Sequence, residues 1–160
     1  MLNSELLKFG AVNLDNVSVI HLDGDFDSVL TLLQGQVTSD CTQITNQFGQ
    51  ISSLCDEKGF VLCNFEIIYD KKKWLIVIEE SSKDIFLDEI SKFLPFYKVE
   101  AKLINFQVMG VTKNKNEKLL SDEHVILQSD DALLLLIIRN NEHLECNLEI
   151  SDWAFNRKFL

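Results

Sequence analysis

Apolar residues recur along the chain with two periods, which predicts a fold that mixes helices and strands. Four apolar residues between Phe26 and Leu33 follow the i, i+3, i+4, i+7 spacing of one helix face. Asp25 precedes them, and its carboxylate could accept a free backbone N–H at a helix start. Gly35 follows, and a glycine just past the last periodic position typically ends a helix.

A second helix is predicted after Ser81 and Ser82, which offer caps at its start. Pro95 is the only proline and is expected to end this helix, because proline lacks the backbone N–H that a helix interior needs. The apolar residues expected on its buried face are Phe86, Ile90, Phe93 and Leu94.

Alternating or β-branched segments predict strands at 17–22, 51–55, 60–69, 74–78, 98–104, 106–111, 124–127 and 133–139. The strand at 60–69 is the most informative. One of its faces is uniformly apolar and should meet the core, whereas the other places Asn64 and Glu66 in mid-strand. The polar turn at 56–59 precedes it, with Gly59 where a positive φ costs little.

The order of these elements predicts an α+β fold, with two helices on one face of an antiparallel sheet in a ferredoxin-like layer. The polar stretch at 112–123 cannot bury much surface and predicts a boundary. We therefore expect an N-terminal lobe at 1–111 and a smaller, β-rich second lobe at 112–160. A helix is expected from Asp152 onward, with Ser151 or Asp152 as its cap.

The charge balance narrows the classes of partner. The chain has 160 residues, with 15 Lys and Arg against 25 Asp and Glu, which gives a formal net charge of −10. Such an acidic chain should repel phosphate backbones, so direct binding to nucleic acid is not expected. The lysines at 71–73 and 113–115 are interpreted as solvated loops.

Cysteine and histidine usage indicates neither a metal site nor a catalytic set. The four cysteines form no Cys-x-x-Cys pair, the three histidines are scattered, and no Ser–His–Asp or Cys–His arrangement is evident. Residues 1–9 lack the pattern of a secretory signal, and the longest apolar run, at 132–138, is too short to span a bilayer. Free thiols without such a signal favour the cytoplasm, and no membrane association is expected.

Several motifs resemble one family. They are Gly24-Asp25 before the first helix, Leu-Gln-Gly-Gln-Val-Thr-Ser-Asp at 33–40, Cys-Asp-Glu-Lys-Gly-Phe-Val-Leu at 55–62, Phe-Tyr-Lys-Val at 96–99, and Trp153. Together they are similar to the YgfZ folate-binding proteins, also described as tRNA-modifying proteins. These are relatives of the glycine-cleavage aminomethyltransferase (T-protein) and of mitochondrial proteins for iron–sulfur maturation. The resemblance runs from about residue 17 to the end and is closest before Gly110.

The resemblance implies tetrahydrofolate binding and a role in iron–sulfur assembly or repair, including that of an enzyme that modifies tRNA. Three departures qualify it. The sequence ends before the family's Lys-Gly-Cys-[Tyr/Phe]-x-Gly-Gln-Glu signature, so activity that needs that cysteine is not expected. Val17 stands where some members have a tryptophan, and valine cannot stack a pterin. Asn64 stands where aminomethyltransferases tend to have an acidic residue.

The candidate folate-binding residues are Gln34, Gln36, Asn64, Glu66 and Trp153. The glutamine amides could read the donor and acceptor edge of a pterin, or they could tie down a helix end and loop. The polar pair on the strand could line a ligand site or face solvent. The tryptophan could stack on the ligand or belong to the core. Asp40 is interpreted chiefly as a cap.

Three functions remain open from the sequence. The first is a YgfZ-like binding module for folate, without bond-making chemistry. The second is an aminomethyltransferase-like, folate-dependent enzyme, which needs a carboxylate near the folate nitrogen. The third is an interaction protein without a ligand, in which apolar segments at 133–138 and 155–160 lie open and support a homodimer.

Overall fold

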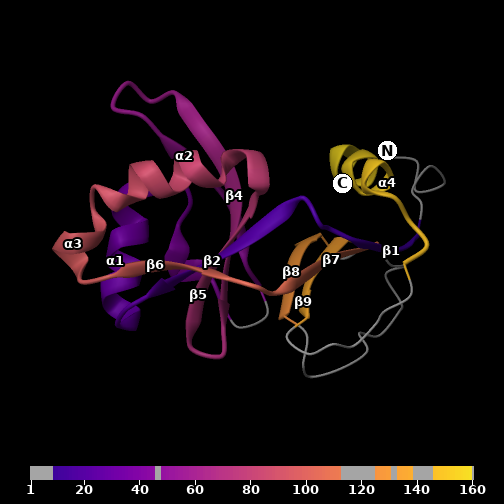
Figure 1. The fold of residues 1–160 in the computed structure, drawn as a ribbon, viewed down its shortest axis with the longest axis horizontal. Helices are drawn as coiled ribbons and strands as arrows, with labels where there is room; N and C mark the ends of the chain where they lie inside the picture. Colours follow the sequence, from indigo (N-terminus) through magenta and orange to yellow (C-terminus); the bar gives the residue numbers. More distant parts are fainter. Residues whose placement is uncertain (1–8, 46–47, 113–124, 131–132, 139–145, 160) are drawn as a thin grey trace. The chain divides into compact units, whose positions relative to one another are not determined.

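A computed structural model of the chain describes residues 9–45, 48–112, 125–130, 133–138 and 146–159 (Figure 1). The chain forms two compact units. Asn16–Asn105 make up the first, here called the continuous unit. Met1–Asp15 and Phe106–Leu160 make up the second, here called the split unit. This division differs from the expected boundary between 111 and 112.

The continuous unit consists of five strands, two longer helices and two short ones. The strands are β2 (Val17–Asp23), β3 (Gln50–Cys55), β4 (Val61–Asp70), β5 (Lys73–Glu79) and β6 (Glu100–Ile104). The helices are α1 (Phe26–Gln36), the 3-10 helix η2 (Cys41–Gln43), α2 (Glu80–Ser91) and α3 (Leu94–Tyr97). The strands form one sheet in the order β3-β4-β5-β2-β6, and every neighbouring pair is antiparallel. The predicted α+β class is confirmed.

The helices pack on one face of this sheet, and the core lies between the two layers. Phe65 of β4 meets Phe86 of α2 edge to face, with ring centroids 5.0 Å apart. Phe86 is fully buried, which stabilises the fold by about 1.5–3 kcal/mol relative to an exposed ring. As the alternation predicted, the core takes its strand residues from one face; they include Ile20, Leu22, Leu54, Cys63, Phe65, Ile67, Trp74, Ile76 and Ile78.

The opposite face of the same sheet is apolar at its centre and polar toward β3. Leu75 and Val77 of β5 are buried, as are Val19 of β2 and Ile68 of β4. Glu66 is only 7% exposed on this face, although glutamate is seldom buried unless it has a partner. The sequence pattern placed Glu66 on this face, beside Asn64.

The hairpin between β3 and β4 forms as predicted. Oδ1 of Asp56 accepts backbone N–H groups from Lys58 and Phe60, both at 2.9 Å. Gly59 has φ +85°, where residues with a Cβ are strained. One carboxylate and one glycine therefore fix the turn. The next hairpin turns at Lys71 and Lys72, whose φ values of 42° and 64° are uncommon for lysine.

Two predicted features at the ends of α1 are wrong. Asp25 occupies the N-cap position, but its side chain makes no capping hydrogen bond. Gly35 does not stop the helix, which continues through Gln36. The helix ends because Val37 is extended (φ −103°, ψ 161°) and bridges to Leu54 of β3. Tertiary pairing, and not a left-handed glycine, therefore ends α1.

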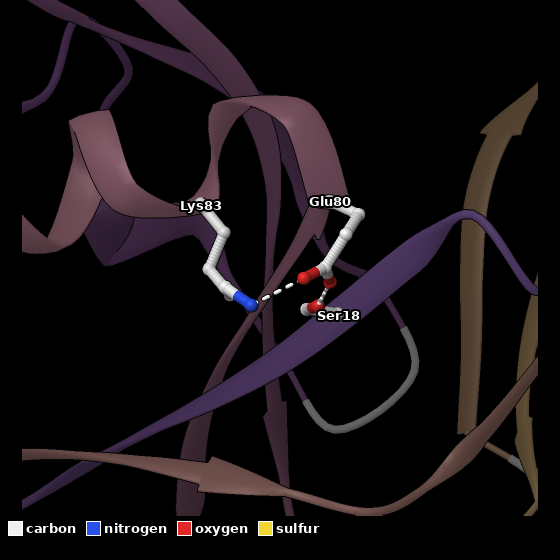
Figure 2. A network of polar contacts seen from close by, with 3 residues as sticks. All are labelled: Ser18, Glu80 and Lys83. Carbon is white, nitrogen blue, oxygen red and sulfur yellow. Dashed lines mark hydrogen bonds and ion pairs between the residues drawn. The ribbon is translucent and has the colours of Figure 1, made fainter.

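Helix α2 begins earlier than predicted, at Glu80, and not after the serines. The Glu80 backbone N–H donates to the carbonyl of Asn16 at 2.8 Å. Figure 2 shows its side chain between Ser18 of β2 and Lys83 one turn along, accepting from the hydroxyl and pairing with the ammonium group. The Lys83 hydrogen bond, followed by that of Ser18, lowers the pKa of Glu80. A network between helix and strand therefore fixes this helix start.

Helix α2 also ends before the proline that was expected to end it. Its last residue is Ser91, and Pro95 stands in the first turn of α3, where a missing N–H costs nothing. The predicted buried face is confirmed for Phe86 and Ile90, and Phe93 and Leu94 pack against the core while partly exposed.

The split unit joins residues from both ends of the chain. Its strands are β1 (Gly10–Asn13), β7 (Gln107–Thr112), β8 (Val125–Asp130) and β9 (Leu133–Ile138), in the order β1-β7-β9-β8. Helix α4 (Ile150–Phe159) begins two residues before the predicted start, and the carboxylate of Asp152 accepts the backbone N–H of Glu149 at 3.0 Å. The side chains at 133–138 and 155–160, expected to form an open apolar surface, lie outside the described part.

The side-chain amide of Asn147 completes the outer edge of β1. Its Oδ1 accepts the Ala11 N–H at 2.9 Å, and its Nδ2 donates to the Phe9 carbonyl at 3.1 Å. The amide therefore pairs with β1 as a peptide group of a neighbouring strand would. Among the residues that the structure describes, no helix has the length and apolar character to cross a bilayer.

Candidate functional site

The candidate site lies in the continuous unit, where the chain leaves α1 and runs along the outer edge of β3. The Val37 N–H still donates to the Leu33 carbonyl at 2.9 Å. One residue later, the Thr38 N–H donates to the carbonyl of Ser53 at 3.1 Å. Residues 37–43 therefore turn from helix to strand edge to 3-10 helix; we call this segment the elbow.

Gln34 and Asp40 hold the elbow in shape. Oε1 of Gln34 accepts the Cys41 N–H at 2.7 Å, and its Nε2 donates to Oδ1 of Asp40 at 3.0 Å. The same Oδ1 accepts the Thr42 hydroxyl at 2.6 Å and the Thr42 N–H at 3.1 Å, which caps η2. These hydrogen bonds, chiefly that of the Thr42 hydroxyl, lower the pKa of Asp40. The interpretation of Asp40 as a cap is confirmed.

Serine side chains join the elbow to β3. The Ser39 hydroxyl donates to Oγ of Ser52 at 2.8 Å, and Ser52 is only 2% exposed. Oγ1 of Thr38 accepts the Ser53 N–H at 3.2 Å. The Ser39 bond gives the buried Ser52 hydroxyl a partner on the helix-facing side of the sheet, next to the core, where an unpaired hydroxyl would be costly.

Gln50, the first residue of β3, braces the elbow from the other side. Its Nε2 donates to the Asp40 carbonyl at 2.6 Å. Because that carbonyl can only accept, the orientation of the amide is fixed. Its Oε1 is buried and has no hydrogen-bond partner in the part of the chain that the structure describes. This acceptor is the one polar atom of the elbow network found to be both buried and unpaired there.

The network continues across the sheet to Asn64. The Ser53 hydroxyl donates to Oδ1 of Asn64 at 2.6 Å, and the two residues are directly opposite in the β3–β4 register. Asn64 is exposed, and Glu66, next on the same face, is buried. A continuous series of hydrogen bonds and backbone links therefore joins Gln34 to Asn64, two residues that are thirty positions apart.

The remaining predicted residues lie at the margin of this network or outside it. Gln36 stands in the last turn of α1, half-buried, and its side-chain amide makes no hydrogen bond among the described residues. Trp153 belongs to the split unit and is 6% exposed. Its indole lies on Gly110 of β7, where an added Cβ would approach Cδ2 to 2.6 Å. Trp153 therefore packs in the core of its own unit.

Sequence reasoning missed the contribution of Gln50, Ser52 and Ser53. A usable pattern existed, because Gln-Ile-Ser-Ser interrupts the alternation expected of a half-buried strand. Polar residues in such a strand need partners, which points to a neighbouring polar segment.

Ionisable groups also lie outside the elbow, on the face of the sheet that carries Asn64, and could be sources of acid–base or metal chemistry. Burial lowers the pKa of His21, and Lys73 and Lys102 lower it further, against an opposing effect of Asp23. Across the described ranges, no three His, Cys, Asp or Glu side chains are grouped so that they could hold a metal ion. The elbow itself offers amides, hydroxyls and one carboxylate, which suit recognition of a polar, planar edge.

Comparison with known proteins confirms the resemblance that the motifs indicated. The chain is 28% identical over 109 residues to the tRNA-modifying protein YgfZ of Vibrio atlanticus. The matched segment covers 68% of this chain and 33% of that protein. It is 26% identical over 135 residues to the YgfZ of Photorhabdus laumondii, covering 83% of this chain and 40% of that protein. No family model matches the chain.

The fold has a solved counterpart. The glycine cleavage system aminomethyltransferase T from Bartonella henselae superposes on 82% of this chain with a TM-score of 0.65, at 9% sequence identity. The match covers 42% of that protein. The chain thus spans about a third of the length of the YgfZ proteins that it matches, and it has the fold of part of an aminomethyltransferase.

Proposed function

We propose, on the basis of the resemblance to the YgfZ proteins, that this chain binds a reduced folate, with tetrahydrofolate as the parent ligand. The observation that supports this most directly is the hydrogen-bonded elbow that links Gln34 to Asn64. A pterin presents a planar edge of alternating donors and acceptors, and amides and hydroxyls are the groups that read such an edge. The unit would act by recognition and not by bond-making.

The proposal gives the candidate residues different roles. The Gln34 amide is already paired at both ends, so it positions the elbow. The groups that would contact the ligand are the amide of Asn64, which is exposed, and that of Gln36, which is half-buried; each retains hydrogen-bonding capacity. Glu66 adjoins Asn64 on the same face. Trp153, which packs in the core of the split unit, would contribute by stabilising that unit.

Transferase chemistry is not proposed for this chain. A carboxylate near the folate nitrogen could orient or deprotonate it, and Asn64 offers a neutral amide where aminomethyltransferases tend to have an acid. We extend the proposal, through the relatives, to a cytoplasmic role in iron–sulfur assembly and tRNA modification. Structurally, we propose to class the continuous unit as a ferredoxin-like layer with β3 added at its edge.

The test is a calorimetric titration of the full chain with 5-formyl-tetrahydrofolate. We expect saturable binding that weakens about tenfold or more in Asn64→Ala and in Gln36→Ala, since each removes a direct hydrogen bond to a polar ligand. Asn105→Ala, an exposed asparagine outside the elbow, is the matched control. Absence of binding at millimolar ligand to the folded chain would overturn the proposal, and turnover with a lipoyl-carrier substrate would favour the enzyme.

A further inference from the structure

Strand β6 forms one edge of the five-stranded sheet. One side of β6 pairs with β2, and its other side pairs with no strand in the ranges that the structure describes. Figure 1 shows β6 as the strand that follows α3. An unpaired edge presents a row of backbone donors and acceptors to any strand of matching pattern.

The side chains of β6 alternate in charge on one face of the sheet. Glu100 and Lys102 flank Ala101, and their side chains are 75% and 50% exposed. Lys102 pairs with Asp23 at 2.6 Å and with Glu100 at 3.4 Å. Such exposed pairs hold a lysine only weakly, so its ammonium group can exchange partners.

The apolar side chains of β6 and its neighbour α3 are unusually open. Leu103, on the helix-facing side opposite Ile20 of β2, is 59% exposed. Phe96 in α3, just before β6, is 82% exposed. The edge strand therefore carries an exposed pair of opposite charges on one face of the sheet. On the helix-facing side it carries an exposed leucine, and an exposed phenylalanine lies in the short helix just before it.

We propose that β6 pairs with β6 of a second copy of this chain, antiparallel and about a two-fold axis through Ala101. Residues directly opposite each other in an antiparallel pair share a face, so the axis must pass through a residue and not between two. With Ala101 at the axis, Glu100 of each copy faces Lys102 of the other. The two sheets then continue into one, with the helices of both copies on the same side.

The charges select this register over its neighbours. An axis through Glu100 would place two glutamates opposite each other, and an axis through Lys102 would place two lysines opposite each other, both of which are unfavourable. The Ala101 register also sets Leu103, which is 59% exposed, opposite position 99 of the second copy, immediately before β6, so the apposed chain would cover part of this leucine. A five-residue edge buries less area than a typical stable interface, so the dimer should be weak and concentration-dependent.

The test is sedimentation of the full chain over a concentration series, combined with charge swaps. Lys102→Glu and Glu100→Lys each place like charges opposite each other in the homodimer, and each should raise the dissociation constant about tenfold or more. An equimolar mixture of the two variants should form a heterodimer, because one copy then carries two lysines and the other two glutamates. The double swap should restore the homodimer.

Lys72→Glu, in an exposed turn outside β6, makes the same change of charge and should not affect association. Circular dichroism verifies that each variant is folded. A chain that stays monomeric at millimolar concentration would overturn the proposal. So would a dimer on which the β6 swaps and Lys72→Glu act equally, or a mixture that does not cross-associate.

Discussion

The indole of Trp153 covers the backbone of Gly110 so closely that a Cβ at position 110 would stand 2.6 Å from Cδ2. Both residues lie within the split unit, one on α4 and one on β7. The glycine is required here by space, since its φ is not in the left-handed region. The tryptophan in turn is fixed by the strand beneath it.

Gly110→Ala should therefore destabilise the chain. The added methyl group would push α4 away from β7, and overpacking of this kind typically costs about 1–3 kcal/mol. Urea unfolding followed by circular dichroism measures the loss. In a Trp153→Leu background the same substitution should cost clearly less, because the clashing ring atoms are gone. Equal costs in both backgrounds would contradict the contact.

Gly35→Ala, in contrast, should stabilise the folded chain. Gly35 lies inside α1, and an added Cβ would meet only the Tyr97 hydroxyl, at an ordinary 3.9 Å. Alanine is better than glycine in a helix by up to about 1 kcal/mol, so the melting temperature should rise. Folate titration of the same variant adds a second readout. Loss of binding with a gain in stability would mean that position 35 is kept small for a ligand.

Asn147→Asp tests the side-chain pairing with β1. The aspartate can still accept the Ala11 N–H, but it cannot donate to the Phe9 carbonyl and would place a negative charge against it. We expect a loss of about 1–3 kcal/mol and faster hydrogen exchange at the Ala11 amide. Asn105→Asp makes the same change at an exposed position outside both contacts. An equal effect of the two substitutions would exclude a specific role for Asn147.

His21 should make the chain sensitive to mild acid. Burial, together with Lys73 and Lys102, lowers its pKa below the ordinary 6.5, although Asp23 acts in the opposite direction. The unfolded chain then binds this proton more readily than the folded chain. Stability should therefore fall as the pH drops below 6.5, until the folded state also titrates. His21→Gln should flatten the pH dependence of the melting temperature there, and an NMR titration of His21 checks the direction of the pKa shift.

The Cys41 thiol should be inert in the folded chain. Burial raises its pKa to about 11, so at pH 8 only about one molecule in a thousand carries the thiolate. Cys146 is exposed and should react with a thiol reagent much faster. Comparing Cys41→Ser with Cys146→Ser assigns the rates. Rapid loss of a thiol that depends on Cys41 would show that the elbow opens readily.

The elements that repeat a local pattern could be predicted, whereas their ends could not. The alternation at β4 identified the core face, and the apolar spacing within α1 identified a helix. The ends depend on distant partners: α1 stops where Val37 meets β3, and α2 starts where Glu80 meets Asn16. No local pattern contains that information.

The candidate site shows the same limit. The motif at 33–40 singled out Gln34, and the alternation of the strand at 60–69 singled out Asn64. Their link runs through Ser39, Ser52 and Ser53, whose roles follow from strand pairing. The split unit was missed for a similar reason. Its first strand pairs with one about a hundred residues later, a contact that neither propensity nor periodicity encodes.

That long-range pairing has a consequence for how the chain is made. Strand β1 leaves the ribosome before its partner strand, and Thr112, the partner of Gly10, follows it out about five to twenty seconds later at ordinary rates of translation. The whole of Asn16–Asn105 emerges during that interval and can collapse around its own sheet. Strand β1 must therefore remain without its β7 partner until the whole sheet of the continuous unit has had time to form.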